Sequence, residues 1–192
     1  IDNLPGVSSQ EGDSYGFDDW STSITVRGFQ TNLGEQQIGS TIDGMPNGNS
    51  NYGGGAKANR YVDTANIKTV TVSQGTADIA SRSLEARGGT IDYRTADPLR
   101  EGRVRAQLAG GEFDAQRYYV RLDTGMLGGT TRAWVSFSHQ NASDWVNGSA
   151  ENERDHFAGK LISELGRAEI TAYLSYDDIH EDNYQRLFSP EE

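Results

Sequence analysis

The second half of the chain alternates apolar and polar residues with a period of two, which is the pattern of β-strands with one apolar face. We expect five such strands after Pro98, joined in chain order as an antiparallel meander. Their apolar positions are Val104, Ala106 and Leu108; Tyr118, Val120 and Leu122; Ala133, Val135 and Phe137; Phe157, Gly159 and Leu161; and Ala168, Ile170, Ala172, Leu174 and Tyr176. The pattern indicates a sheet rather than a helical core.

The connections between these strands differ in length. Short turns with glycine, at Gly128-Gly129 and Leu165-Gly166, follow the second and fourth strands, whereas a longer polar loop over residues 141–154 follows the third. Short turns on one side and long loops on the other are typical of outer-membrane barrels, in which the short turns face the periplasm. We therefore expect the loop over residues 141–154 to be extracellular.

The first 98 residues are organised differently, as short strands separated by glycines. We expect strands over residues 24–26, 37–43, 67–72 and 90–94, and a short helical or irregular piece over residues 78–84. Residues 44–46 are interpreted as a turn, and residues 47–59 offer nothing that a core could use, so they must form a loop. The expected fold is a mixed α/β domain over residues 1–98, followed by antiparallel barrel strands over residues 99–192.

The polar faces of the first two expected barrel strands carry four cations, Arg103, Arg105, Arg117 and Arg121. These side chains would point into the barrel. Two interpretations are open: they pair with carboxylates of the first domain, such as Asp92 or Glu85, or they line a wet lumen.

Composition excludes several classes of protein. The formal net charge of -11 argues against a nucleic-acid partner, and the absence of cysteine excludes disulfides and thiolate metal sites. The three histidines have no ligand-like spacing, so we expect no metal site and no zinc enzyme. No Ser-His-Asp set or opposed carboxylate pair is recognisable, so we expect no catalytic residue and no cofactor. No run of about 20 apolar residues could form a membrane-spanning helix.

Five short motifs follow one another in the first domain. They are Leu4-Pro5-Gly6-Val7, Val26-Arg27-Gly28-Phe29, Ile42-Asp43-Gly44-Met45-Pro46, the segment 65–75, and Gly88-Gly89-Thr90-Ile91 with Thr95. In this order and spacing they resemble the plug domain of TonB-dependent outer-membrane receptors. The resemblance implies a plug inside a barrel of about 22 strands. It also implies an energy-coupling box that precedes the plug.

This chain shows about five strand candidates and no such box, so we interpret it as an internal fragment with an N-terminally truncated plug. Five strands cannot close, and an open edge in hydrocarbon leaves backbone groups unpaired. One departure from the family concerns charge. Thr69 and Thr71 stand where the family usually has an arginine and a glutamate, which leaves open whether charge pairing between plug and barrel survives.

Candidate ligand contacts lie in the plug. Arg27 is either an exposed cation at a strand end or a group aimed at a ligand or an interior carboxylate. In the family the outer loops of the plug contact the ligand, which implies a role for Asn47, Asn49, Asn51, Tyr52, Lys57, Asn59, Arg60 and Tyr61. Gly28, Asp43, Gly44, Gly88 and Gly89 are interpreted as backbone requirements of the plug. The acidic residues Asp177, Asp178, Glu181 and Asp182 could bind Ca²⁺ but are better explained as a solvated loop.

The resemblance implies a receptor of the Gram-negative outer membrane that binds a scarce extracellular solute, such as siderophore-bound iron, and imports it by TonB-driven displacement of the plug. The expected partners are the TonB complex of the inner membrane, outer-membrane lipid and a small extracellular ligand. Cobalamin, haem, other metal chelates and oligosaccharides fit the family equally well. The alternative is a secreted β-rich module that binds carbohydrate or another ligand, with the alternating strands forming a sandwich.

Overall fold

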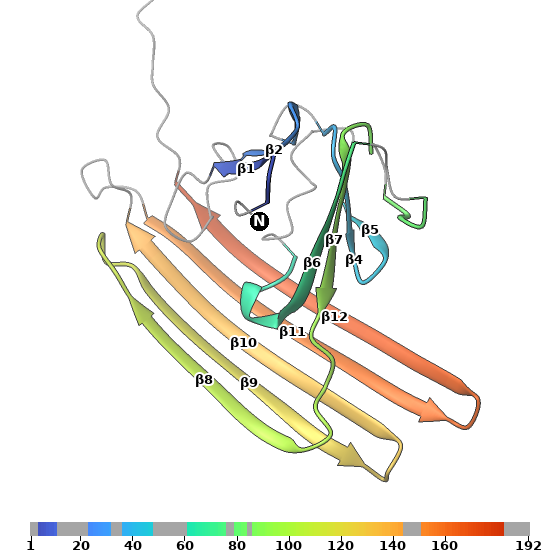
Figure 1. Ribbon diagram of the computed structural model, residues 1–192. Coiled ribbons are helices and arrows are strands. Elements are labelled where there is room, and N and C mark those ends of the chain that lie inside the picture. Colours follow the sequence, from blue (N-terminus) through green and yellow to red (C-terminus); the bar gives the residue numbers. More distant parts are fainter. Residues whose placement is uncertain are drawn as a thin grey trace, which may run out of the picture.

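Strands make up nearly all of the regular structure in the described part of the chain (Figure 1). The computed structural model describes residues 4–10, 23–31, 36–47, 61–75, 79–83, 86–143 and 151–182. Within these ranges the strands form three sheets, and the helical structure is limited to the single 3-10 turn η3 (Thr64–Asn66). No helix in these ranges has the length and apolar character needed to cross a membrane.

In the described residues of the plug, the expectation of a mixed α/β domain is therefore wrong in its helical part, which is limited to η3. Residues 79–83, within the expected helical or irregular piece, form a turn followed by irregular chain. The Ser81 hydroxyl accepts a hydrogen bond from the Ser83 backbone and donates to the Asp92 carboxylate. Serine side chains that bond nearby backbone in this way compete with helix formation.

The largest sheet is an antiparallel meander of five strands, as the alternation predicts. It contains β8 (Gly102–Gly110), β9 (Gln116–Leu127), β10 (Thr131–Ser143), β11 (Glu151–Leu165) and β12 (Ala168–Glu181), paired in chain order. β8 and β12 are its edges, so the sheet is open. Gly128, Gly129 and Gly166 have positive φ in the two tight turns, which glycine adopts without strain.

The two faces of this sheet differ as expected. Residues that point toward η3 and β7, here called the inward face, are buried in β9 and β10, and Tyr119 and Trp134 are among them. Their neighbours on the outward face are open, with Val120 43% and Val135 44% exposed. The smaller sheets lie over the inward face alone, which leaves the apolar outward face uncovered (Figure 1).

The strands continue beyond their apolar stretches. β10 extends to Ser143 and β11 begins at Glu151, and these two residues are register partners. The loop expected over residues 141–154 is therefore shorter, and residues 144–150 lie outside the described part. Likewise β12 includes Asp177, Asp178 and Glu181, so the expectation of a solvated acidic loop is wrong for them. Backbone pairing continues where the side chains have become polar, because the ladder does not depend on an apolar face.

Two smaller sheets form the first domain, which is called the plug below after the family resemblance. β1 (Val7–Gln10), β2 (Ser23–Val26) and β3 (Phe29–Thr31) make an antiparallel sheet. β4 (Gly39–Ile42), β5 (Met45–Asn47), β6 (Ile67–Gln74) and β7 (Gly89–Thr95) make a sheet in the order β5-β4-β7-β6, in which β4 and β7 run parallel. Val7, Val26, Ile38, Ile91 and Tyr93 form the buried core between them. Burial raises the pKa of Tyr93 to about 12.

The plug contains two tight hairpin turns of the same kind. Arg27-Gly28 connects β2 to β3, with φ of 50° and 88°, and Asp43-Gly44 connects β4 to β5, with φ of 49° and 80°. Positive φ at both central residues is the two-residue turn that suits the twist of paired strands. Met45 and Pro46 belong to β5 rather than to the turn that we expected over residues 44–46.

Candidate functional site

The plug meets the five-stranded sheet through buried polar side chains, beginning at η3. Asp63 caps this turn and accepts a hydrogen bond from the Ala65 backbone at 2.8 Å. Its other contacts come from the large sheet. Arg117 Nη2 lies 2.6 Å from Oδ1, and Ser138 Oγ donates to Oδ2 at 2.6 Å. The Asp63 side chain is fully buried, so the plug places one carboxylate directly against β9 and β10.

Asn66, at the other end of η3, uses both atoms of its amide group. Nδ2 donates to Ser136 Oγ at 2.8 Å, and Oδ1 accepts from the Tyr119 hydroxyl at 2.8 Å. All three residues are buried. We call Asp63 and Asn66 together with their four partners on β9 and β10 the η3 anchor.

The charge of Asp63 is maintained in the η3 anchor. Burial opposes ionisation of this carboxyl, but the hydrogen bond from Ser138, the charge of Arg117 and the Ala65 backbone N–H favour the ionised form. The net result is that the pKa of Asp63 lies below its usual value. The Asp63 carboxylate therefore remains charged at neutral pH.

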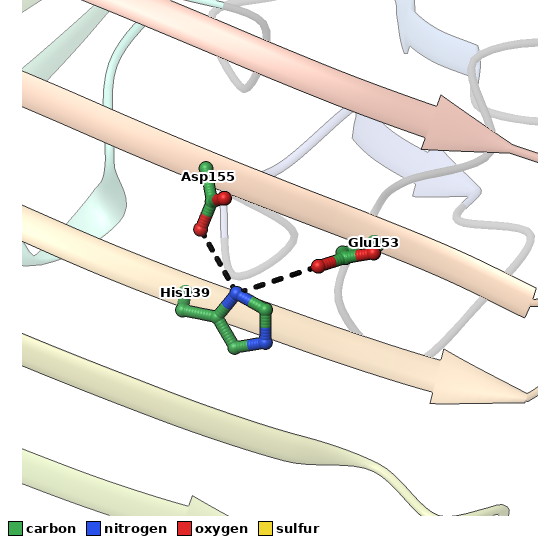
Figure 2. A group of neighbouring side chains, drawn as sticks. All are labelled: His139, Glu153 and Asp155. Atoms are coloured by element: carbon green, nitrogen blue, oxygen red, sulfur yellow. Dashed lines mark hydrogen bonds and ion pairs between the residues drawn. The ribbon is translucent and has the colours of Figure 1, made fainter.

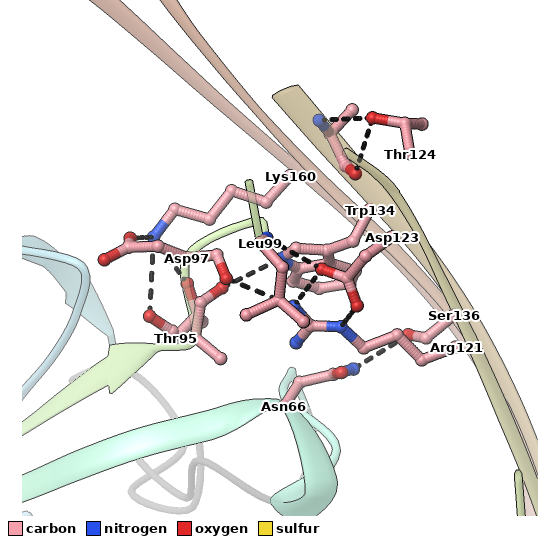
Figure 3. Close-up of polar contacts among 12 residues, drawn as sticks. Asn66, Thr95, Asp97, Leu99, Arg121, Asp123, Thr124, Trp134, Ser136 and Lys160 are labelled. Atoms are coloured by element: carbon pink, nitrogen blue, oxygen red, sulfur yellow. Dashed lines mark hydrogen bonds and ion pairs between the residues drawn. The ribbon is translucent and has the colours of Figure 1, made fainter. Parts of the chain in front are cut away.

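A second contact joins β11 to the end of β7 (Figure 3). Lys160 Nζ lies 3.0 Å from Thr95 Oγ1, 3.0 Å from Asp97 Oδ1 and 3.4 Å from Asp43 Oδ2. Asp43 is held in place by Thr95, whose backbone N–H and hydroxyl both donate to its carboxylate. The lysine side chain is only 6% exposed. All three partners of its amine belong to the plug or to the connector that follows β7.

The connector between β7 and β8 is fixed to the same face. Arg121 holds Asp123 through two hydrogen bonds of 2.9 and 2.7 Å and also donates to the Asp97 carbonyl at 3.2 Å. The Leu99 N–H donates to Asp123 at 3.0 Å, and Trp134 Nε1 donates to a connector carbonyl at 2.7 Å. The Arg121 guanidinium also lies 4.6 Å from the centre of the Trp134 ring, within the range of a cation–π contact (Figure 3).

Charge and hydrogen bonding rather than apolar packing dominate the contacts described between plug and sheet. Each buried charge in the η3 anchor has a partner, which is the condition under which polar burial is tolerated. An interface of this kind is specific in register. It also differs from an apolar core, because its polar groups can form hydrogen bonds with water when the plug and the sheet separate.

The charge partner of Arg117 is one that sequence reasoning missed. Of the two open interpretations, pairing with a plug carboxylate holds for Arg117, but the suggested carboxylates were Asp92 and Glu85. Asp92 accepts hydrogen bonds from Thr41 and Ser81 within the plug, and Glu85 lies outside the described residues. Asp63 could have been noticed as a helix-capping residue, yet nothing in the sequence places it opposite β9.

The other three arginines of the first two strands of the large sheet, Arg103, Arg105 and Arg121, have different surroundings. Arg121 pairs within its own strand, with Asp123. Arg105 lies 5.8 Å from the Tyr119 ring centre, and Arg103 is exposed. Charge pairing between plug and barrel is present despite Thr69 and Thr71, because it comes from Asp63 and Lys160 instead.

The candidate ligand residues are only partly described. Arg27 Nε donates to Gln74 Oε1 at 3.0 Å, and Gln74 in turn donates to the Pro5 carbonyl at 2.7 Å. The Tyr61 carbonyl accepts a weak hydrogen bond from the Tyr173 hydroxyl at 3.4 Å, and Asn47 ends β5. The remaining candidates, Asn49, Asn51, Tyr52, Lys57, Asn59 and Arg60, lie outside the described residues. Their role in binding stays a prediction.

Two glycines stand where a side chain would collide with neighbouring chain. A Cβ on Gly89 would come much closer than 3.0 Å to the Ser73 carbonyl oxygen, and φ there is +129°. A Cβ on Gly88 would collide in the same way with the Phe29 Cβ. These positions bring β6 and β3 close to the start of β7, which agrees with the interpretation of both glycines as backbone requirements.

Comparison with known proteins relates this architecture to one family. Residues 1–89 match the family model of the TonB-dependent Receptor Plug Domain. The fold is similar to that of the pyoverdine outer membrane receptor FpvA from Pseudomonas aeruginosa PAO1, with a TM-score of 0.72 and 21% identity over 91% of this chain and 24% of that chain. The sequence has no significant match among curated proteins.

Two further solved structures have the same fold. The ferric yersiniabactin uptake receptor FyuA from Yersinia pestis matches with a TM-score of 0.67 and 16% identity, over 91% of this chain and 27% of that chain. The Ferric-Catecholate import receptor Fiu from E. coli K12 matches with a TM-score of 0.66 and 22% identity, over 93% and 24%. The chain thus spans about a quarter of the length of these receptors.

Proposed function

We propose that this chain belongs to the TonB-dependent receptor family, whose plug model matches residues 1–89, and that the receptor containing it imports a scarce extracellular solute across the Gram-negative outer membrane. The family is one of transport receptors, so no covalent chemistry is assigned to the chain. Residues 1–98 act as the plug and residues 99–192 as the first part of the barrel wall. The plug closes the lumen until the TonB complex of the inner membrane displaces it.

The outward face of the large sheet supports the membrane location. Apolar residues follow one another in register across neighbouring strands, and Phe137, Phe157 and Tyr176 form one such row. All three are at least 40% exposed. A continuous apolar face of this kind fits contact with lipid, and aromatic residues are typical of its borders. A secreted β-sandwich would need a second layer over this face, and the described residues supply none.

The η3 anchor is the observation that carries the proposed mechanism. Ion pairs and hydrogen bonds hold the plug against the barrel wall, and in the closed state each buried charge of the η3 anchor has a partner. Displacement exchanges these contacts for water instead of exposing a large apolar core. The import step is then a population shift between closed and open plug states, and the coupling energy comes from TonB.

We propose a ferric chelate as the solute. The similar receptors carry pyoverdine, ferric yersiniabactin and ferric catecholate in their names, which supports this class over the other ligands of the family. Arg27 and the polar segment over residues 47–61 supply cations, amides and aromatic rings, a set suited to a polar chelate. Asn47 and Tyr61 mark the two ends of this segment.

Uptake of radiolabelled iron chelates by cells that produce the full-length receptor tests the proposal. Deletion of residues 48–60 should abolish binding of the chelate, whereas Arg27→Ala should weaken it at least tenfold. Deletion of the TonB gene should leave binding intact and stop uptake. Undiminished binding in both variants would refute the assignment of the ligand site, and undiminished uptake without TonB would refute the mechanism.

A further inference from the structure

A compact group of metal-binding side chains lies on the outward face of the large sheet, away from the plug. His139 projects from β10, and Glu153 and Asp155 project from β11 (Figure 2). His139 Nδ1 is 2.8 Å from Asp155 Oδ1 and 3.8 Å from Glu153 Oε1. The nitrogen and both carboxylate oxygens all lie within 4.8 Å of one another.

The backbone holds these donors in place. His139 and Asp155 are direct register partners in the β10–β11 ladder, and Glu153 lies two residues further along the same face. A metal ion with bonds of about 2.0 to 2.2 Å places neighbouring donor atoms about 3 to 3.5 Å apart. The two nitrogen–oxygen distances bracket this range, so a cation could replace the proton between His139 and Asp155 with small side-chain rotations.

A separate feature of the same face favours a cation. Asp178 on β12 is the direct register partner of Asp155, and two carboxylates in that position repel each other. A recess of about 150 Å³ beside the triad is lined by Glu153, Asp155, Asp178 and His180. In the described residues of β9 to β12, every Arg and Lys belongs to the inward face, so no side-chain cation other than a protonated histidine balances these carboxylates.

We propose that His139, Glu153 and Asp155 bind a divalent first-row transition cation of the Zn²⁺ type. An imidazole with two carboxylates suits such ions, whereas an all-oxygen set would favour Ca²⁺ or Mg²⁺. The bound cation joins β10 to β11 near the ends at which residues 144–150 connect them. Asp178 and His180 lie beside the site on β12 and line the recess next to it.

The site lies next to the aromatic row of the outward face along β10 and β11. Asp155 lies two residues beyond Phe157, which belongs to the aromatic row of the outward face, and His139 lies two residues beyond Phe137. Its placement at the membrane border rests on the proposed function, but its cation chemistry does not. Further strands beside β12 would extend the sheet sideways and leave the outward face of β10 and β11 open.

Isothermal titration of the purified, chelator-stripped full-length receptor in detergent with Zn²⁺ tests the site. We expect His139→Ala and Asp155→Asn each to remove one Zn²⁺ per receptor or to weaken its binding at least tenfold. X-ray absorption of the loaded receptor should show an imidazole nitrogen at about 2.0 to 2.1 Å. Ca²⁺ at the same concentration should not displace the ion.

Asn141→Ala is the matched control, because Asn141 is the register partner of Glu153 but is not a donor of the triad. It should bind Zn²⁺ like the parent receptor. Equal stoichiometry and affinity in the parent and both site variants would overturn the proposal, as would displacement of Zn²⁺ by equimolar Ca²⁺. Equal loss of binding in the Asn141→Ala control would identify an adventitious ion only. None of these outcomes depends on iron uptake, so failure of this site and failure of the import function are distinguishable.

Discussion

The carboxylate of Asp63 in the plug and the guanidinium of Arg117 in β9 form a buried ion pair, with 2.6 Å between Oδ1 and Nη2. The two residues are 54 positions apart in the sequence. They belong to the two parts of the chain that would separate in the proposed displacement of the plug. The strength of this pair therefore bears directly on how firmly the barrel is closed.

Arg117→Ala should weaken plug docking by about 3 to 5 kcal/mol, because it leaves the Asp63 charge buried without its partner. Amide hydrogen exchange of β6 and β7 in the full-length receptor measures the opening free energy. Arg105→Ala is the matched control, since Arg105 is an exposed cation on the same face and lies over the Tyr119 ring. It should change the opening free energy by less than about 1 kcal/mol. Equal effects of the two substitutions would contradict the η3 anchor.

Docking of the plug should weaken in acid. The native pKa of Asp63 is below its usual value near 3.8, so its stabilising contribution is complete above that value and is lost as the pH falls through the lowered native pKa. Burial also opposes ionisation of Asp97, but Lys160 and Lys68 bring its pKa below the usual value, so this carboxyl adds to the same trend. Hydrogen exchange should show constant docking above about pH 5 and a decline below about pH 4.

Asp63→Asn provides the control for this acid dependence. The variant should dock more weakly at neutral pH and lose docking less steeply between about pH 5 and pH 2, because one of the titrating groups has been removed. An unchanged slope would assign the acid response to other carboxylates.

Lys160→Met should destabilise the closed state by about 1.5 to 3 kcal/mol, the usual worth of hydrogen bonds to a charged group. The substitution keeps an unbranched side chain of similar length but removes the contacts to Asp43, Thr95 and Asp97. Lys68→Met is the matched control: Lys68 also pairs with Asp97, at 3.3 Å, but its side chain is 60% exposed. Urea-induced plug release in the purified receptor should shift for the first variant and hardly for the second.

Gly89→Ala should prevent correct formation of the β6–β7 pair. The new Cβ would collide with the Ser73 carbonyl oxygen, and the backbone cannot move without breaking the ladder. Gly44→Ala is the comparison, since Gly44 also has positive φ but a Cβ there would meet nothing within 4 Å beyond its chain neighbours. We expect a loss of about 1 kcal/mol at Gly44 and a much larger loss at Gly89, measured by thermal unfolding of the full-length receptor.

Val135→Arg should impair membrane assembly. Val135 lies on the outward face between Leu122 and Gly159, and an arginine on the lipid face costs about 2 to 4 kcal/mol near the bilayer midplane. Gln107→Arg places the same residue on the inward face of β8 and should be tolerated. The amount of folded receptor in isolated outer membranes distinguishes the two, and equal yields would argue against lipid contact on this face.

The sequence predicted most of the strands but few of the contacts. The period-two pattern identified all five strands of the large sheet, and Arg27-Gly28 and Asp43-Gly44 carry the glycine that their turns require. Strand ends were less accurate, because β10 to β12 continue into polar residues that backbone pairing alone keeps in register. The piece expected as helical or irregular over residues 78–84 is irregular in its described part, where the Ser81 hydroxyl bonds the nearby Ser83 backbone.

The cation site shows the same division between local pattern and spatial arrangement. Spacing along the chain gave the histidines no metal-binding signature, since His139 meets Glu153 and Asp155 only across the β10–β11 ladder. Two residues paired across a β-ladder are separated in the sequence by a distance that depends on the length of the connecting loop. Their spacing along the chain therefore does not indicate a metal site.

By itself the sequence determined that this protein has a glycine-punctuated domain followed by amphipathic strands, because periodicity and turn chemistry are local properties of the chain. Only the tertiary structure decided which charges meet. Asp63 rather than Asp92 receives Arg117, and Lys160 joins Asp43 to Asp97, because the position of η3 over the sheet fixes these pairs. Long-range polar pairing depends on how two folded units dock, which no single segment encodes.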